Sequence, residues 1–372
     1  MPPSLVTASR VIAGRPVRAT LSTDFEDPAW DRFLCSVPDG QFQQSSLWAQ
    51  AKRGDRWVCL RVIFEQDGAT VGGFQIQSKQ TRAGKVGFLS RGPVLALKTP
   101  EAEAFVLDTL IGLVKSQRIA ALFLQPPDEG ARWIELLGRR GFYLDRFFHF
   151  TDASLWVDLS GPPDAWKAKW RTDRRAAVRT AVKLGTTLYE AADADIPRFF
   201  ELMQSSCRRQ GVPPSPGTLE ATQEMVRAFA KAGLARITFA VCQGEPVATV
   251  LDLRFGKRFT TFKKGWNGQH GKHKPNVFLT HDSMSKAHEL GCTCFDFAGL
   301  WRPLAEAVLA EQPLTPELEN HYDAYKLGFG GVPKLLPPTM IYCRNPFLRM
   351  ACRQIEKHPR LAEPFKRFAE KL

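Results

Sequence analysis

The segment 166–185, WKAKWRTDRRAAVRTAVKLG, is the most basic part of the chain and the first place where residue types and spacing indicate a chemistry. On a helix, residues four apart lie along one slowly drifting stripe. A stripe of one sign of charge attracts anions, so the segment predicts a polyanionic partner, either nucleic acid or a phosphate-bearing substrate. A solvated surface helix is the alternative. The cations of this basic stripe are Lys167, Arg171, Arg175, Arg179 and Lys183.

The other face of the same segment is apolar and is expected to pack on the protein core. Gly185 ends the predicted helix, and residues 186–191 resume as a strand. The segment is therefore predicted to be one helix that is held by one face and exposes its cations on the other. The apolar face consists of Trp166, Trp170, Ala177, Val178, Ala181 and Val182.

Acidic, thiol and imidazole side chains give weaker signals. Asp296 ends a buried strand in CFDFAGL, where it is a candidate general base or a group that holds an amine; a structural carboxylate that caps a neighbouring loop is the alternative. None of the eight cysteines forms a CxxC pair, and the seven histidines contain no HxxxH pair. Zinc sites need such spacings, so we expect no metal.

The composition is that of a globular protein with an excess of positive charge. The chain has 372 residues, enough for two domains, and its net charge of +13 favours anionic partners. Residues 1–14 lack the continuous apolar core of a signal peptide, and no run approaches the roughly 20 apolar residues of a membrane span. We expect a cytoplasmic protein with reduced thiols and no stable membrane insertion.

The first half of the chain predicts an α/β unit. Two strands meet at Asp67-Gly68, a strong hairpin signal. An amphipathic helix follows at 100–117, and IAALFLQ at 119–125 is predicted to be a buried strand. Residues 1–16 are expected to form a loose tail.

The second half repeats this layout. A meander of three strands at 235–267 precedes a helix at 276–291 and a buried strand at 292–300, whereas 303–320 is predicted to be an acidic, loop-rich insertion. This similarity of pattern indicates two copies of one α/β unit with a mixed sheet. A Pro- and Gly-containing boundary is expected near 158–162.

Several segments, in their order along the chain, resemble the FemABX family of peptidoglycan aminoacyltransferases. The resemblance implies two GNAT-like acyltransferase domains, 1–160 and 161–332, with 333–372 packing back onto the first. The segments are FQQSSLWAQAK at 42–52, GGFQIQ at 72–77, SRGPVL at 90–95, DRRAAVRTAVKLG at 173–185, PNVFLTHDSMSKAHELGCTCFDFAGL at 275–300 and AYKLGFGG at 324–331.

The resemblance also implies a reaction. Members of the family move an amino acid from aminoacyl-tRNA to the stem peptide of a UDP-linked or lipid-linked cell-wall precursor, without a cofactor. The segment 166–185 is too short for the coiled-coil arm of some members, so the chain looks like the compact ones that use UDP-MurNAc-pentapeptide. A monomer is expected, because two fused units already cover each other's faces.

Specific residues match positions that the family uses. Lys326, after Tyr325 and before a Gly-rich turn, matches the lysine credited with stabilising the charge that develops on the carbonyl oxygen. Lys52, in the helix that carries Trp48, matches a lysine that binds the precursor's diphosphate. Arg91 and the backbone N–H near Gly92 are expected to reach the same phosphates.

Part of the family's precursor pocket is not reproduced, since GVPPSPGTLEA at 211–221 lacks the arginine and tyrosine expected there. Either the acceptor differs, or four other cations hold its phosphates. The basic stripe, together with the basic C-terminal segment from Arg344 to Arg367, is expected to contact tRNA phosphates. The four substitute cations are Arg208, Arg209, Lys263 and Lys264.

Two other functions fit the sequence less well. A GNAT-type N-acyltransferase would transfer an acyl group from acyl-CoA or another acyl donor to a sugar or an amino acid, but the Q/R-x-x-G-x-G/A loop of CoA-using enzymes is not found in WNGQHGKHKPNVFLT. A non-catalytic nucleic-acid-binding protein on the same scaffold is the other alternative.

Overall fold

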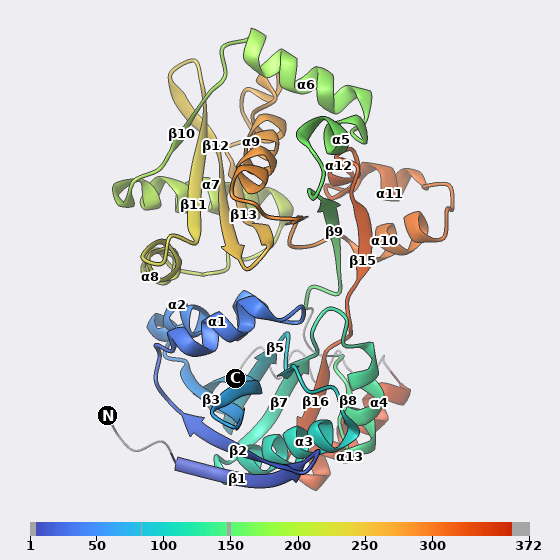
Figure 1. Ribbon diagram of the computed structural model, residues 1–372. Helices are drawn as coiled ribbons and strands as arrows, with labels where there is room; N and C mark the ends of the chain where they lie inside the picture. Colours follow the sequence, from blue (N-terminus) through green and yellow to red (C-terminus); the bar gives the residue numbers. More distant parts are fainter. Residues whose placement is uncertain (1–4, 83, 147–149, 359–372) are drawn as a thin grey trace. The chain divides into compact units, whose positions relative to one another are not determined.

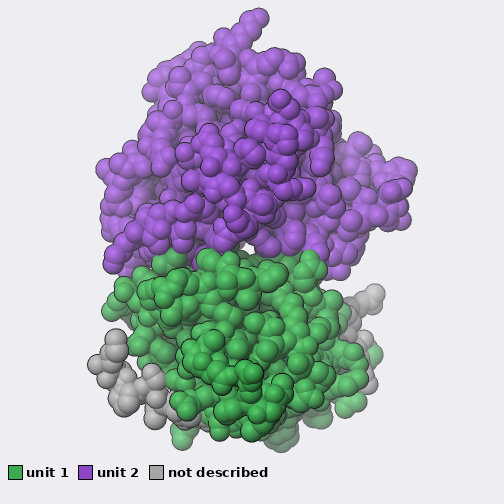
Figure 2. Space-filling view, in the orientation of Figure 1, with its two compact units in different colours: residues 1–150, 336–372 green, residues 151–335 purple. Residues whose placement is uncertain are grey.

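The computed structural model describes residues 5–82, 84–146 and 150–358, and contacts divide the chain into two compact units. Unit 1 comprises residues 1–150 and 336–372, and unit 2 comprises residues 151–335 (Figure 2). Of the basic C-terminal segment, Arg360, Lys366 and Arg367 lie outside the described residues. Among the described helices, none has the length and apolar character needed to cross a membrane.

Unit 1 is built on a mixed sheet with the order β1-β2-β3-β4-β5-β7-β16-β8, to which β6 adds by pairing with β4 (Figure 1). Its neighbours are antiparallel except for the parallel pair β5–β7. The strands are β1 (Leu5–Ile12), β2 (Arg15–Ser22), β3 (Val58–Gln66), β4 (Ala69–Thr81), β5 (Gly84–Ser90), β6 (Val94–Leu95), β7 (Ile119–Gln125), β8 (Tyr143–Leu144) and β16 (Met340–Cys343). The helices are α1 (Pro28–Ser36), η1 (Phe42–Gln44), α2 (Ser46–Ala51), η2 (Arg53–Asp55), α3 (Pro100–Ser116), α4 (Ala131–Arg139) and α13 (Pro346–Lys357).

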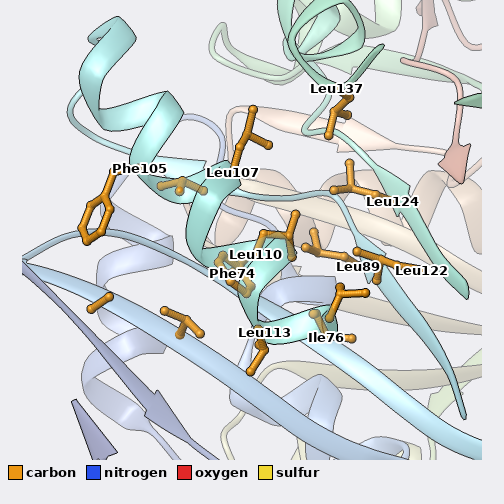
Figure 3. Packing of buried hydrophobic residues seen from close by; sticks show 14 of the residues in the cluster. Phe74, Ile76, Leu89, Phe105, Leu107, Leu110, Leu113, Leu122, Leu124 and Leu137 are labelled. Atoms are coloured by element: carbon orange, nitrogen blue, oxygen red, sulfur yellow. The ribbon is translucent and has the colours of Figure 1, made fainter. Parts of the chain in front are cut away.

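Helix α3 supplies much of the core of unit 1. Thr99 caps it by accepting a hydrogen bond from the amide of Ala102, and Pro100 follows at the first helical position, where its missing N–H costs nothing. Leu110 and Leu113 then pack against strand residues such as Ile76 (Figure 3). Burying each such side chain contributes about 2 kcal/mol relative to exposure.

A buried carboxamide closes the sheet of unit 1 where two strands part. β4 pairs with β5 only from Gln77 to Thr81. Next to that pairing, Nε2 of Gln44 donates to the carbonyl of Ser90 at 2.7 Å and to that of Gln75 at 3.3 Å, and its Oε1 accepts from the amide of Gln75 at 2.8 Å. Because buried backbone groups need partners, Gln44 takes the place of the missing ladder bonds.

The same region encloses an arginine. Arg61 is fully buried, and its Nε and Nη2 donate to Oε1 of Gln75 at 3.1 and 2.7 Å. Its Nη1 lies 3.5 Å from the carboxylate of Asp27 and donates to the carbonyl of Asp24 at 3.1 Å. The side chain of Gln75 therefore supplies the main acceptor for a buried cation.

Unit 2 contains a second mixed sheet, with the order β10-β11-β12-β13-β14-β9-β15. Only β13 and β14 run parallel. The strands are β9 (Ala153–Asp158), β10 (Thr187–Glu190), β11 (Ala235–Cys242), β12 (Glu245–Phe255), β13 (Arg258–Trp266), β14 (Cys294–Asp296) and β15 (Val332–Leu335). The helices are α5 (Pro163–Ala168), α6 (Thr172–Lys183), η3 (Asp193–Asp195), α7 (Ile196–Gln210), α8 (Leu219–Ala230), η4 (Gly271–His273), α9 (Pro275–Glu289), α10 (Arg302–Leu309), α11 (Pro316–Asn320) and α12 (Ala324–Leu327).

The prediction of one continuous helix over the basic segment is wrong. The segment forms α5 and α6, with a break at Lys169–Arg171. At the break, the amide of Arg171 donates to the carbonyl of Gly328 at 2.9 Å, so a contact within unit 2 replaces a helical hydrogen bond. Trp166 and Trp170 are buried as expected, whereas Val182 is exposed.

Two segments expected to be irregular are regular. Residues 5–16 of the expected tail belong to the antiparallel pair β1–β2, which turns at Ala13-Gly14, where both residues have positive φ; residues 1–4 lie outside the described residues. Residues 302–320 contain α10 and α11, because Leu304, Ala305 and Ala307 of α10 are buried.

The buried Arg61–Gln75 pair gives a stability prediction. Gln75→Leu removes the acceptor of a fully buried guanidinium and should lower the free energy of unfolding by about 3 kcal/mol, measured by urea denaturation. Gln80→Leu, at an exposed position of the same strand, is the matched control and should change it by about 0.5 kcal/mol or less. Equal effects of the two substitutions would refute a structural role for the pair.

Candidate active site

A cavity of about 670 Å³ opens in unit 2 where β13 and β14 part. The two strands pair only from Arg258 to Thr260, opposite Cys294 to Asp296. β13 then continues to Trp266, pairing with β12 on its other side. The second half of β13, the C-terminal half of α7 and the segment around α12 line the cavity.

Close contact between α7 and β13 forms one wall. A Cβ atom on Gly265 would lie 2.6 Å from the backbone of Leu202 and Met203, so only glycine allows this approach. The amide of Trp266 donates to the hydroxyl of Ser206 at 2.9 Å and fixes the crossing. Trp266 and Ser206 both line the cavity.

A β-bulge in β13 turns one lysine toward α9. Leu251 pairs with Lys263 and Asp252 with Thr261, so Phe262 is the extra residue. Beyond the bulge, Lys264 faces the same side as Thr261, three positions earlier: Nζ of Lys264 donates to Thr280 on α9 at 3.0 Å. The bulge therefore places Lys264 on the side of β13 that faces α9.

Lys326 holds a positive charge at the cavity wall. Its Nζ donates to the carbonyl of Gly299 at 2.6 Å and lies 2.5 Å from Oδ1 of Asp323. Its side chain is 14% exposed and that of Asp323 is 6% exposed. An ammonium has three N–H donors, and these two contacts orient it before any ligand arrives.

Tyr325 stands between two lysines. Nζ of Lys264 donates to its hydroxyl oxygen at 2.5 Å. Burial alone would raise the pKa of Tyr325, but the charges of Lys264 and Lys326 and hydrogen bonds with Lys264 and Thr280 outweigh it and lower that pKa. Tyr325, Lys326 and Lys264 thus form one cluster. The sequence analysis predicted a different role for Lys264, that of a phosphate ligand.

Asp296 has the partners of a structural carboxylate. Its Oδ1 accepts from the hydroxyl of Ser154 at 2.5 Å and from the amide of Ala298 at 2.8 Å, and Arg258 lies 3.6 Å from its Oδ2. It caps the turn that presents the carbonyl of Gly299 to Lys326, so it shapes the site indirectly. This arrangement favours the loop-capping alternative over a general base.

Residues at the start of α6 and in the break before it contact α12 and the turn that follows it. Nε of Arg174 donates to the carbonyl of Tyr325 at 3.3 Å, and Trp170 packs edge-on against Phe329 with ring centres 5.0 Å apart. A Cβ on Gly330 would lie 2.6 Å from Lys169, so the Gly-rich turn after α12 is shaped to receive this segment. The N-terminal part of the basic segment thus contacts the turn that carries Tyr325 and Lys326.

The basic stripe itself is exposed mainly toward its C-terminal end. Arg171, Arg179 and Lys183 are exposed, whereas Lys167 and Arg175 are half-buried. Nζ of Lys167 lies 5.2 Å from the ring centre of Trp166, and Arg175 donates to the carbonyl of Ala168 at 3.1 Å.

Three of the four substitute cations line the cavity. Arg209, Lys263 and Lys264 line the cavity, whereas Arg208 is exposed and is not among the described residues that line it. The guanidinium of Arg209 lies 5.2 Å from the ring centre of Trp266 and donates to Ser205 at 3.0 Å. The cavity is therefore rich in cations.

The predicted ligands in unit 1 have internal partners. Nζ of Lys52 lies 5.0 Å from the ring centre of Trp48. Arg91 is 7% exposed, and its Nη1 donates to Oδ1 of the buried Asp128 at 2.9 Å. The amide of Gly92 donates to the carbonyl of Gln125 at 3.1 Å, so it does not point at a phosphate as expected.

Sequence reasoning missed two buried acids, Asp323, which contacts Lys326, and Asp252. Asp252 on β12 is 1% exposed and accepts from Thr261 at 2.9 Å and from Ser283 at 2.6 Å. Burial raises its pKa to about 6, against these hydrogen bonds and the charges of Lys264 and Arg236. A lone acid in the alternating run TVLDLRF was its signal in the sequence.

The raised pKa of Asp252 predicts a pH dependence of stability. The folded state holds the proton more tightly than the unfolded state, whose pKa is near 4, so this stabilising contribution is full below about pH 4 and is lost as pH rises through about 6. A shift of two units corresponds to about 3 kcal/mol. Asp252→Asn should abolish this contribution to the slope of the free energy of unfolding against pH, measured by urea denaturation between pH 4 and 7.

Asp164→Asn, at an exposed position in α5, is the matched control and should leave the slope unchanged. An identical slope in the wild type and in Asp252→Asn would contradict the predicted protonation of Asp252.

Comparisons with known proteins identify similar sequences and similar folds. The model of an acetyltransferase (GNAT) domain matches residues 168–304. The chain is 25% identical over 193 residues to the lipid II:glycine glycyltransferase of Staphylococcus aureus; the match covers 49% of this chain and 46% of the relative. The chain thus spans about half the length of the curated relatives it matches.

Two solved structures share the fold. A crystal structure of FemX superposes with a TM-score of 0.73 and 18% identity, over 86% of this chain and 96% of that one. A tandem GNAT protein from the clavulanic acid biosynthesis pathway superposes with a TM-score of 0.54 and 10% identity, over 89% and 99%. The predicted fold class is confirmed. The chain is thus similar to a glycyltransferase over about half its length, and it has the fold of tandem GNAT proteins.

Proposed function

We propose that the protein transfers an amino acid from aminoacyl-tRNA to the stem peptide of a peptidoglycan precursor, in the cytoplasm. The observation that carries the proposal is the pre-oriented ammonium of Lys326, held by Gly299 and Asp323 on the wall of a cavity rich in cations. The likeness to a protein named lipid II:glycine glycyltransferase and to FemX supports the same reaction class.

The reaction is the aminolysis of an ester. An amine of the acceptor attacks the aminoacyl carbonyl carbon, negative charge develops on the carbonyl oxygen, and the ribose hydroxyl leaves. A fixed cation beside that oxygen stabilises the transition state more than the ground state. Lys326 takes this role because its two contacts within the protein hold the ammonium in place and spare reorganisation during the reaction.

The donor is assigned to unit 2. The exposed cations Arg171, Arg179 and Lys183 suit a phosphate backbone, and the bases make no contribution in this proposal. Arg209 and Lys263, on the cavity wall, suit phosphate groups nearer to the reacting ester. Such binding is dominated by charge and therefore weakens steeply with salt.

The acceptor is assigned more coarsely. Lys52 remains the candidate for the diphosphate of the precursor, whereas Arg91 and the amide of Gly92 are engaged within unit 1. A UDP-linked and a lipid-linked precursor present the same stem peptide and phosphate chemistry. Both are therefore acceptors to test.

One observation favours a second candidate function. The family model that matches residues 168–304 is described as an acetyltransferase domain, so an acyl-CoA donor is the alternative. This enzyme would use the same cavity and the same Lys326, with a thioester in place of the ribose ester. The donor requirement distinguishes the two functions.

A transfer assay resolved by mass tests the proposal. The purified protein is mixed with a charged total-tRNA pool and UDP-MurNAc-pentapeptide or its lipid-linked form, with and without ribonuclease. We expect the acceptor to gain the mass of one aminoacyl group, and ribonuclease to abolish the gain. The gain should also fall steeply with salt, because several phosphate contacts release counterions.

A parallel arm replaces charged tRNA with acetyl-CoA. Transfer from acetyl-CoA that ribonuclease does not affect would replace the proposal with the alternative function. The variant Arg179→Glu, Lys183→Glu reverses exposed charges of the basic stripe and should weaken transfer from tRNA without affecting the fold. Undiminished transfer by this variant would remove the stripe from the donor site.

The role of Lys326 is tested by Lys326→Met. Loss of one oxyanion-stabilising group should lower kcat about 100- to 1,000-fold, measured under saturating donor. Lys231→Met, at an exposed position after α8, is the control and should keep full activity. Because Lys326→Met leaves the buried Asp323 without its cation, the double variant Asp323→Asn, Lys326→Met separates stability from chemistry. Near-normal kcat in either variant would exclude Lys326 from the reaction.

A further inference from the structure

We propose that Tyr325 is the general base of the reaction: its hydroxyl oxygen, held by Lys264, accepts a proton from the attacking amine and returns it to the leaving ribose oxygen. This inference rests on the proposed function and adds to it the group that handles the proton. Ester aminolysis needs such a group, because an amine that has attacked carries an extra proton and an alkoxide is a poor leaving group.

The geometry places the Tyr325 hydroxyl beside the reacting groups. Tyr325 lines the same cavity as Lys326, and the charge of Lys326 acts on its phenol, so an acyl carbonyl bound in this cavity is within reach of both side chains in this proposal. Nζ of Lys264 donates to the phenol oxygen at 2.5 Å, which is the polarity that a phenolate requires. Lys264 is itself fixed by Thr280 at 3.0 Å.

The charges around Tyr325 favour its ionised form. Lys264 faces it from β13, and Lys326 from its own helix, where Asp323 partly offsets the charge of Lys326. From α6, Arg174 donates to the backbone carbonyl of Tyr325 at 3.3 Å. Burial raises the pKa of Tyr325, but the lysines and the hydrogen bonds with Lys264 and Thr280 outweigh it and bring the pKa below its usual value.

One more acid belongs to this environment. Asp252 on β12 accepts a hydrogen bond from Thr261 and interacts electrostatically with Lys264. On the remaining sides, the ring of Phe329 meets that of Tyr325 edge-on at 6.1 Å, and the α9 residue nearest the phenol, Thr280, does not titrate. Lysines therefore dominate the field at the phenol oxygen.

The proton and electron balance closes without another reactant. The amine nitrogen forms a bond to the carbonyl carbon, and the carbonyl electron pair moves to its oxygen beside Lys326. The phenolate of Tyr325 takes one proton from the amine nitrogen. As the carbonyl re-forms, the bond to the ribose oxygen breaks, and that oxygen takes the proton back from Tyr325. The products are an amide and a free ribose hydroxyl.

The inference is tested by Tyr325→Phe, which keeps the ring and removes the hydroxyl. We expect kcat to fall about 100- to 10,000-fold with KM little changed, since the hydroxyl handles a proton and does not bind the ground state. Tyr189→Phe is the matched control. Tyr189 lies on β10 and is not among the described residues that line the cavity, so this variant should keep the wild-type kcat.

Lys264 gives a second, independent readout. Rate should rise with pH as Tyr325 ionises, and Lys264→Met should move this rise to higher pH because the phenolate loses its nearest cation; Lys264→Arg should restore it in part. The same shift should be visible without any substrate. Tyrosinate ultraviolet absorbance, taken as the difference between the wild type and Tyr325→Phe, should titrate below the ordinary value of about 10 and move upward in Lys264→Met.

The outcomes separate this inference from the proposed function. If the wild type transfers an amino acid from tRNA and Tyr325→Phe does so at the same rate, or if Lys264→Met leaves both titrations unmoved, the inference is overturned and the proposed function stands. If the wild type transfers nothing from tRNA, the proposed function is overturned regardless of how Tyr325 titrates.

Discussion

The short parallel pairing of β13 with β14 is the constraint on which the architecture of unit 2 depends. After three paired residues on each strand, β14 ends at Asp296 and β13 runs on, so one edge of β13 faces a cavity in place of a neighbouring strand. Three local features fit this edge to chemistry. Gly265 lets α7 cross it closely, the bulge at Phe262 turns Lys264 inward, and the carboxylate of Asp296 caps the turn that follows β14. Each is a departure from regular strand geometry, which is typical of sites that need a backbone to re-aim side chains.

The cations of the site differ in how their charge is compensated. Lys326 has a carboxylate and a carbonyl as partners, whereas Lys264 donates to two hydroxyl oxygens. A neutral partner leaves the field of an ammonium largely intact, and in a partly desolvated cavity that field acts strongly on its neighbours. The field of Lys264 lowers the pKa of both Tyr325 and Asp252. Burial outweighs this effect at Asp252, whereas at Tyr325 the charges of Lys264 and Lys326 and the hydrogen bonds together outweigh burial.

The mixed α/β fold could be predicted from the sequence, because strand hairpins and amphipathic helices are local patterns, whereas only the family resemblance pointed to Tyr325 and Lys326. The bulge at Phe262 could not be predicted, because it is visible only as a shift of register between β12 and β13. The break of the basic helix depends on a contact from Gly328 to Arg171, far apart in sequence. The internal partners of Arg91 and Gly92, which are Asp128 and Gln125, could not be predicted either, because these residues lie more than 30 positions away in the sequence.

The bracing of α12 by α6 gives unit 2 a thermodynamic linkage. Arg171 carries its side chain in the basic stripe while its backbone amide holds the carbonyl of Gly328, and Arg174 holds the carbonyl of Tyr325. Any polyanion that orders the start of α6 therefore also orders the turn that carries Tyr325 and Lys326. Such coupling is reciprocal: a small ligand that settles in the cavity must tighten the polyanion on the stripe by the same factor by which the polyanion tightens the small ligand. If one substrate placed its polyanionic part on the basic stripe and its small reactive part in the cavity, the binding of each part would strengthen the binding of the other through the protein as well as through their covalent bond.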